Sequence, residues 1–173
     1  MTRERIWRMV LWGAAAVALV LGAVEAVREE KMSSALAAGT PPPGFVAARA
    51  DGAPFALSEL KGKVVLLSFW ATWCEACRRE RPMLRALAAE HRSRGVELVA
   101  ASVDEEGARK EAVAVWPEAR VVFPTGATGS DWHAGTLPTL YVLGRDGRIV
   151  SGHSGIASET AVRRAIDEAL SGP

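Results

Sequence analysis

Residues 61–82 read KGKVVLLSFWATWCEACRRERP. The residues from Val64 to Trp70 form a nearly continuous apolar run, which is typical of a central strand covered on both faces. Apolar residues then recur at helical spacing from about Glu75 to His91. A strand that passes almost directly into a helix predicts that two cysteines, Cys74 and Cys77, lie at the start of that helix.

The remainder of the chain shows further short apolar runs, separated by turn signals, and a last helical pattern. A strand followed by a helix, a second such pair, a hairpin and a closing helix together predict an α/β fold with a central mixed sheet flanked by helices. The run 121–123 is too short to assign. The other predicted elements are a hairpin at Asp51-Gly52, strands over 96–103, 139–143 and 148–151, and helices over 105–115 and after an N-cap at Ser158.

The spacing Cys74-Glu75-Ala76-Cys77 is typical of a reactive dithiol. Amides at a helix N-terminus stabilise a thiolate and lower a thiol pKa from about 8.5 to between about 3.5 and 7.5. Cys74 is then expected to attack a disulfide and Cys77, one turn into the helix and less exposed, to resolve the mixed disulfide. The negative charge of Glu75 opposes a thiolate at Cys74 and favours a more reducing dithiol.

Three other roles for the cysteines are less favourable. A structural disulfide closing so short a loop adds only about 2 kcal/mol to the stability of a domain that already has a core. A metal site lacks ligands, because His91, His133 and His153 are not at ligand spacing. Haem attachment requires a histidine where Arg78 stands. We therefore predict redox chemistry without a metal or cofactor.

The chain of 173 residues has 21 basic and 20 acidic side chains, a balance that argues against binding to nucleic acid. Residues 1–8 contain three arginines and precede a long uncharged run, which predicts a cytoplasmic N-terminus followed by a transmembrane anchor over 9–27. A cleaved signal peptide is the alternative, and both export the remainder of the chain. Residues 28–44 are predicted to be a proline-rich tether, and residues 45–173 the folded domain.

The stretch 61–82 resembles the TlpA/ResA/DsbE-like branch of the thioredoxin superfamily. The resemblance continues through GTLPTLYVL over 135–143 and Asp146-Gly147, so that it covers roughly Phe45 to the C-terminus. It implies a thioredoxin-like fold for this region. An exported domain behind a membrane anchor is also a feature of that branch.

The resemblance also implies roles for residues near the dithiol. The Leu137-Pro138 bond should be cis and face the cysteines, with the backbone before Pro138 pairing with the substrate chain; without the resemblance, a trans proline at a strand edge would be favoured. Glu80, three residues after Cys77, should move protons between the thiols if burial raises its pKa. A solvated glutamate among arginines is the alternative. Trp73 offers an apolar surface to a polypeptide, or simply packs.

These features predict an exported, membrane-anchored oxidoreductase that reduces protein disulfides, with cytochrome c maturation as one setting. Its partners would be exported proteins with disulfides, such as apocytochrome c, and a membrane thiol carrier as electron donor. One alternative is an oxidant or isomerase using the same dithiol. Others are a thiol peroxidase, although Ala71 stands where peroxiredoxins of the usual kind have threonine or serine, and a binding module with an incidental disulfide.

Overall fold

The computed structural model describes residues 12–13, 15–20, 22 and 34–172. The predicted cytoplasmic residues 1–8 and much of the predicted anchor lie outside the described residues. Residues 12–13, 15–20 and 22 are helical, and no helix among the described residues is long and apolar enough to cross a membrane. The chain divides into two units, Met1–Met32 and Ser33–Pro173, and the second holds every strand that is described.

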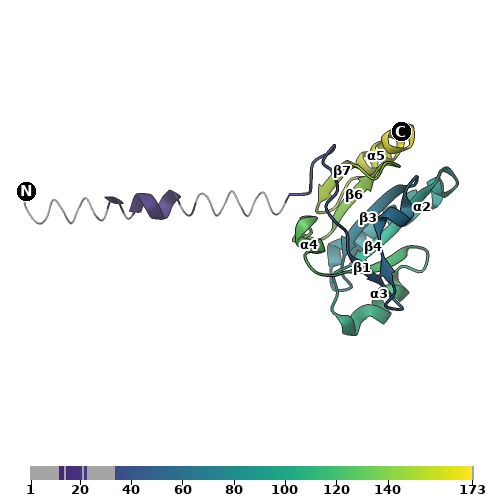
Figure 1. The fold of residues 1–173 in the computed structure, drawn as a ribbon, viewed down its shortest axis with the longest axis horizontal. Helices are drawn as coiled ribbons and strands as arrows, with labels where there is room; N and C mark the ends of the chain where they lie inside the picture. Colours follow the sequence, from purple (N-terminus) through teal and green to yellow (C-terminus); the bar gives the residue numbers. More distant parts are fainter. Residues whose placement is uncertain (1–11, 14, 21, 23–33, 173) are drawn as a thin grey trace, which may run out of the picture. The chain divides into compact units, whose positions relative to one another are not determined.

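A seven-stranded mixed sheet with the order β2-β1-β5-β4-β3-β6-β7 forms the centre of the domain (Figure 1). Strand β3 pairs in parallel with β4 and antiparallel with β6, while β5 is parallel to β4 and the outer strands are antiparallel to their neighbours. The predicted mixed sheet is thereby confirmed. The strands are β1 (Ala47–Arg49), β2 (Pro54–Phe55), β3 (Val64–Trp70), β4 (Val96–Ser102), β5 (Arg120–Pro124), β6 (Thr139–Leu143) and β7 (Ile149–Ser154).

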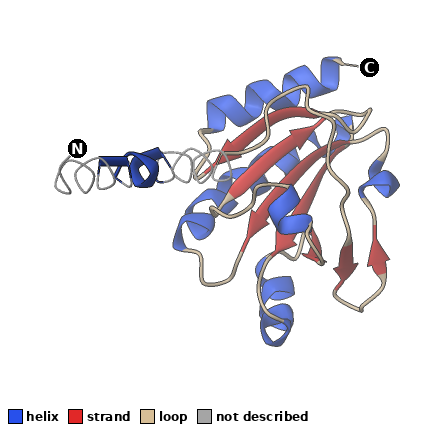
Figure 2. Ribbon diagram, turned by 60° about the vertical axis from the view of Figure 1, so that its left-hand side comes forward, coloured by secondary structure: helices blue, strands red, loops and turns tan. Residues whose placement is uncertain are grey.

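Helices lie on both sides of this sheet (Figure 2). The closing helix begins as predicted after Ser158, whose hydroxyl accepts the amide of Ala161 at 3.3 Å. The helix predicted over 105–115 instead begins with a 3₁₀ turn, Glu106–Ala108, before its α-helical part. In the unit Ser33–Pro173, the described α-helices are α2 (Glu75–His91), α3 (Arg109–Val115), α4 (Thr128–Asp131) and α5 (Glu159–Ser171), and the other 3₁₀ turns are Leu57–Leu60 and Arg92–Arg94.

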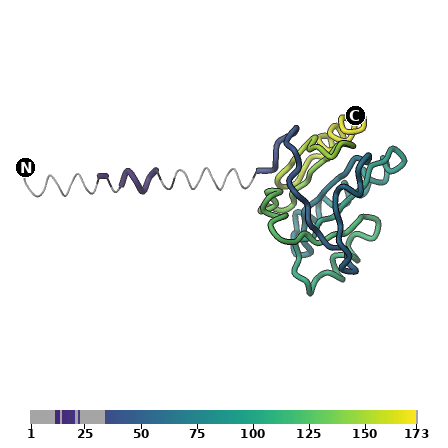
Figure 3. Tube along the Cα trace, in the orientation of Figure 1, coloured from purple at the N-terminus to yellow at the C-terminus, as the bar shows by residue number. Residues whose placement is uncertain are grey.

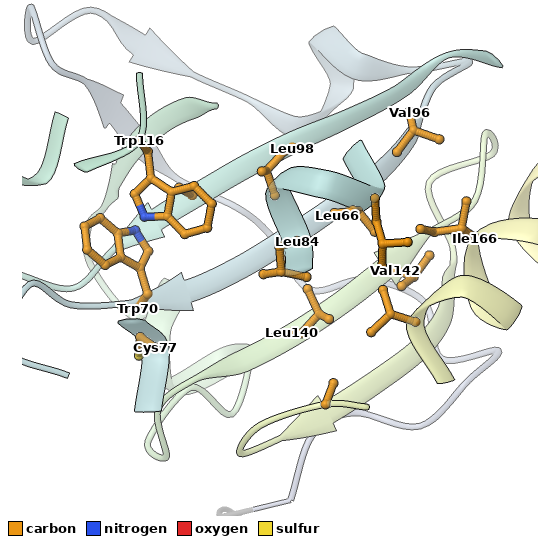
Figure 4. Packing of buried hydrophobic residues seen from close by; sticks show 14 of the residues in the cluster. Leu66, Trp70, Cys77, Leu84, Val96, Leu98, Trp116, Leu140, Val142 and Ile166 are labelled. Atoms are coloured by element: carbon orange, nitrogen blue, oxygen red, sulfur yellow. The ribbon is translucent and has the colours of Figure 1, made fainter. Parts of the chain in front are cut away.

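Strand β3 is buried along its whole length and contributes side chains to both hydrophobic cores. Alternate side chains face opposite sides of a strand, so Val64, Leu66 and Trp70 join one core while Val65, Leu67 and Phe69 join the other. Side chains of α2, α3 and α5 complete the first core, part of which is shown in Figure 4. Full burial of one such large apolar side chain contributes about 1.5–3 kcal/mol, so the position of β3 is firmly fixed.

Residues 34–44 belong to the domain, although the sequence places them in the tether. The segment passes beside the β6–β7 hairpin before it reaches β1 (Figure 3). The amide of Leu36 donates to the Tyr141 hydroxyl at 3.1 Å, and the amide of Gly39 donates to the carbonyl of Ile149 at 2.8 Å. The predicted domain boundary at Phe45 is therefore too late, because this segment packs through irregular backbone contacts that leave no periodic pattern in the sequence.

Gly152 in β7 allows this segment to approach the sheet closely. A Cβ atom at this position would collide with the carbonyl oxygen of Leu36 and lie 2.9 Å from Cε1 of Tyr141. The absence of a side chain at Gly152 thus makes room for the backbone of residues 34–37 over the strand.

We predict that Gly152→Ala displaces this segment and destabilises the chain by about 1–3 kcal/mol, because neither neighbouring group is the free end of a flexible side chain. Chemical denaturation measures the change. Gly129→Ala in α4 is the matched control, since its Cβ meets nothing within 4 Å and should leave stability within about 0.5 kcal/mol of the unchanged chain. Equal stabilities for the two variants would contradict the predicted collision.

Candidate active site

The two cysteines lie where β3 ends and α2 begins, as the sequence predicts. Cys74 is the N-cap of α2, and its sulfur accepts the amide of Cys77 at 3.1 Å. A disulfide joins the two residues, with their Cα atoms 5.3 Å apart. The sulfur of Cys74 therefore sits among the free amides of the first helical turn, at the positive end of the helix dipole.

Both cysteines are largely buried, whereas the tryptophan before them is not. Cys74 is 6% exposed and Cys77 is 4% exposed. Cys77 is therefore less exposed than Cys74, as predicted, but only slightly. Both belong to the core that contains Trp70. Trp73 is 70% exposed, which is incompatible with plain packing of this side chain in the core.

Glu80 is buried one turn beyond Cys77 on α2. Its side chain is 2% exposed, and Oε1 accepts the amide of Ala157 at 2.9 Å. Burial raises the pKa of this carboxyl above its ordinary value, and the hydrogen bond from Ala157 opposes part of that rise. The alternative of a solvated glutamate is therefore excluded.

Glu75 does not present an uncompensated charge to the dithiol. Its carboxylate forms an ion pair with the guanidinium of Arg78, whose Nε lies 3.0 Å from Oε2. The hydrogen bond and the charge of Arg78 lower the pKa of Glu75, and the pair is exposed to solvent. The inference that Glu75 makes the dithiol more reducing therefore loses its basis, because Arg78 offsets the negative charge.

The Leu137–Pro138 peptide bond is cis, as the resemblance implies. Thr139 begins β6 opposite Phe69 of β3, so Pro138 lies at the same end of the sheet as the cysteines. The carbonyl of Pro138 accepts the amide of Gly155 at 2.8 Å, which ties this segment to the loop after β7.

Asp104 is a residue of this region that sequence reasoning did not find. Its carboxylate accepts the backbone amide of Thr72 at 2.9 and 3.0 Å, the Thr72 hydroxyl at 2.8 Å and the Ser102 hydroxyl at 2.7 Å. These bonds hold the loop that leads from Trp70 to Cys74. Its position just after β4 could have indicated this contact. The carboxyl ends of neighbouring parallel strands, here β3 and β4, lie at the same edge of a sheet.

Comparison with known proteins agrees with this geometry. Residues 38–151 match the family described as AhpC/TSA family. The chain is 35% identical over 119 residues to thiol-disulfide oxidoreductase ResA of Bacillus cereus, and the aligned region covers 65% of this chain and 66% of that protein. The chain thus spans slightly less than two thirds of the length of that relative. It is 34% identical over 130 residues to thiol-disulfide oxidoreductase ResA of Bacillus subtilis, covering 72% and 71%.

The fold also has a close counterpart among solved structures. A candidate thiol:disulfide interchange protein DsbE from Chlorobium tepidum superposes with a TM-score of 0.70 at 31% identity, covering 78% of this chain and 99% of that one. The chain therefore belongs to the AhpC/TSA family, in its TlpA/ResA/DsbE-like branch with the thioredoxin-like fold.

Proposed function

We propose that this chain is an exported, membrane-tethered thiol-disulfide oxidoreductase that reduces disulfides in other proteins. The observation that carries the proposal is the Cys74–Cys77 disulfide at the N-terminus of α2, with the buried carboxyl of Glu80 on the same helix. The names of the ResA relatives from Bacillus support the same chemistry.

The reaction begins with the reduced dithiol. The thiolate of Cys74 attacks one sulfur of the substrate disulfide, the substrate S–S bond breaks, and the other substrate sulfur leaves as a thiolate that takes up a proton. The Cys77 thiolate then attacks the sulfur of Cys74 and releases the second substrate sulfur. Two electrons pass from the chain to the substrate, and the chain ends with the Cys74–Cys77 disulfide that the structure contains.

Glu80 serves as the proton acceptor for Cys77 in the second step. Residues three apart lie on the same face of a helix, so the carboxyl follows Cys77 by one turn. A carboxyl whose pKa is raised toward neutrality takes a proton from a thiol more readily than an ordinary glutamate does.

The burial of both cysteines supports reduction of the substrate by this chain rather than its oxidation. Taking a thiolate out of water destabilises it, and a dithiol whose reduced form is destabilised gives up electrons readily. One amide, that of Cys77, donates to the sulfur of Cys74 and offsets part of this effect. Because Arg78 compensates Glu75, burial replaces the charge of Glu75 as the reason to expect a reductant.

Trp73, Leu137 and Pro138 would form the surface that binds the substrate. Trp73 supplies an exposed aromatic face beside Cys74. Leu137 is partly buried and precedes the cis bond, where its backbone could pair with an extended substrate chain. This arrangement suits an unfolded or extended polypeptide.

The N-terminal sequence supports export and tethering, with the domain on the outer face of the membrane or, after cleavage, free in the periplasm. A reductant in that compartment needs a membrane thiol carrier that returns electrons to Cys74 and Cys77. Exported proteins with disulfides, apocytochrome c among them, are the substrates we propose.

We predict that Cys77→Ser traps substrates as mixed disulfides with Cys74, because the resolving thiol is missing. Mass spectrometry of material that a reducing agent releases from the purified chain would identify them. Cys74→Ser is the matched control and should trap none. Equal trapping by both variants, or by neither, would argue against exchange that starts at Cys74.

We predict that Glu80→Gln slows resolution of the mixed disulfide by at least about tenfold at neutral pH, since a positioned general base contributes about 10²–10⁴-fold. In the unchanged chain the rate should rise as pH passes the raised pKa of Glu80, because only the carboxylate accepts a proton. Single-turnover kinetics measure both effects. The control is Glu90→Gln on the same helix, an exposed residue paired with Arg163, which should change neither the rate nor its pH profile. An unaltered pH profile in Glu80→Gln would refute the role of Glu80 as proton acceptor.

Glu80 should also make stability depend on pH. Its pKa is higher in the folded than in the unfolded chain, so the buried group costs nothing below the unfolded pKa of about 4.3 and destabilises the fold as pH rises through the folded value. Glu80→Gln should therefore gain stability relative to the unchanged chain as pH rises. Denaturant titrations across this range would show a pH-independent difference between the two chains if the carboxyl were solvated in the folded state, because its pKa would then be the same folded and unfolded.

A further inference from the structure

Arg81 on α2 is a partly buried arginine that has no acceptor in the structure. Its Nε atom is buried without a hydrogen bond, and its guanidinium forms no ion pair with any described residue. Two other arginines of α2 are compensated, since Arg78 pairs with Glu75 and Arg85 pairs with Glu118. A donor withdrawn from water without an acceptor costs free energy, and the charge of Arg81 is left available to a neighbouring anion.

The position of Arg81 on the helix brings it to the resolving cysteine. Arg81 follows Cys77 by four residues, so the two side chains lie one above the other on the same face of α2. Cβ atoms at this spacing are about 5–6 Å apart. Side chains of a helix lean toward its N-terminus, so the stem of Arg81 leans back over the turn that carries Cys77.

This face of α2 packs on the apolar core rather than facing water. One turn beyond Arg81, Arg85 pairs with Glu118, which lies two residues after Trp116. The ring of Trp116 packs edge to face on Trp70, with ring centroids 5.7 Å apart, and both belong to the core that contains Cys77 (Figure 4). A charge at this position is therefore screened less than it would be in water.

The other charged groups around Cys77 already have partners. Glu80 on α2 accepts the amide of Ala157, and Asp104 after β4 accepts the amide of Thr72. Surface ion pairs hold further charges on α2, α3 and α5, namely Glu75–Arg78, Glu106–Arg109 and Glu159–Arg163. Arg81 thus stands apart as a partly buried charge of this region without a partner among the described residues.

We infer that Arg81 is a positioning residue for the second step of the exchange, in which its charge stabilises the thiolate of Cys77. The inference rests on the proposed function, because it concerns the same dithiol. In this step the Cys77 thiol gives its proton to Glu80, and the thiolate attacks the sulfur of Cys74. The bond between Cys74 and the substrate sulfur breaks, and that sulfur leaves with the electron pair and takes up a proton. Arg81 keeps its own proton throughout.

The oxidised state of the dithiol accounts for the missing acceptor of Arg81. The sulfur of Cys77 is uncharged in the disulfide, so the anion that Arg81 would face exists only after reduction. Burial makes this thiolate costly to form, because it is withdrawn from water. The cation of Arg81 offsets part of that cost at the resolving cysteine, one turn away on the same helix face.

The first measurement is the titration of Cys77 in the full chain carrying Cys74→Ser, which leaves Cys77 as its single thiol. Arg81→Met keeps an apolar stem and removes the charge. It should lower the acid dissociation constant of the Cys77 thiol about tenfold, because an opposite charge nearby favours the charged form. The ultraviolet absorbance of the thiolate as a function of pH measures the change, and carboxyl groups do not contribute to it.

The second measurement is the single-turnover rate of resolution with both cysteines present. At neutral pH Arg81→Met should slow this step about threefold, because a tenfold loss of thiolate is partly offset by the greater nucleophilicity of a more basic thiolate. The loss should vanish at a pH high enough to ionise Cys77 in both chains. A purely structural effect of the substitution would not disappear in this way.

Two variants act as controls. Arg81→Lys keeps the charge and should hold the dissociation constant of Cys77 within about threefold of the unchanged chain. Arg79→Met removes an exposed charge two residues from Cys77, on a different face of α2, and should change that constant less than about twofold because water screens it.

An unchanged titration of Cys77 in Arg81→Met would overturn the inference. Equal shifts in Arg81→Met and Arg81→Lys would also overturn it, because packing rather than charge would then be responsible, and so would an equal shift in Arg79→Met. If the unchanged chain failed to exchange with protein disulfides, the proposed function would be refuted. The titration of Cys77 would still show whether Arg81 acts on its thiolate, so the two failures are distinguishable.

Discussion

The site depends on the burial of strand β3 between two cores, with β4 on one side and β6 on the other. This constraint fixes the end of the strand, and the chain then enters α2 within a few residues, so that Cys74 becomes the helix N-cap. The parallel neighbour β4 ends at the same edge and leads to Asp104, while antiparallel β6 starts there after Pro138. One well-buried strand thus brings two distant parts of the chain, around Asp104 and Pro138, to the edge of the sheet where the dithiol lies.

The carboxyl groups of Asp104 and Glu80 then connect the elements that flank the cysteines. Asp104 binds the amide and hydroxyl of Thr72 and so fixes the loop before Cys74. Glu80 accepts the amide of Ala157 and so joins α2 to the loop before α5. Glu80 is also the group to which we assign proton transfer, and its carboxyl is buried and has a raised pKa. A substitution of Glu80 is therefore expected to affect both the contact between α2 and the loop before α5 and the proposed proton transfer.

Periodic parts of the sequence predicted the fold well. The apolar run of β3 and the helical spacing of α2 gave the bounds of both elements, and the resemblance gave the cis bond at Pro138. Partners that depend on tertiary structure could not be predicted in this way. The bond from Ala157 to Glu80 uses a backbone amide that any residue except proline could supply, and Asp104 meets Thr72 across 32 positions of sequence. The pairing of Glu75 with Arg78, by contrast, could have been predicted from their spacing on a helix.

The direction of electron flow is the central claim, and the reduction potential of the Cys74–Cys77 pair tests it most directly. Equilibrating the chain with defined mixtures of oxidised and reduced dithiothreitol, followed by thiol quantification, gives the midpoint potential. Burial of both sulfurs, with Glu75 compensated by Arg78, predicts a potential in the range of reductants such as thioredoxin, about −270 mV. A midpoint near about −120 mV, the value for the strong oxidant DsbA, would contradict a reducing function.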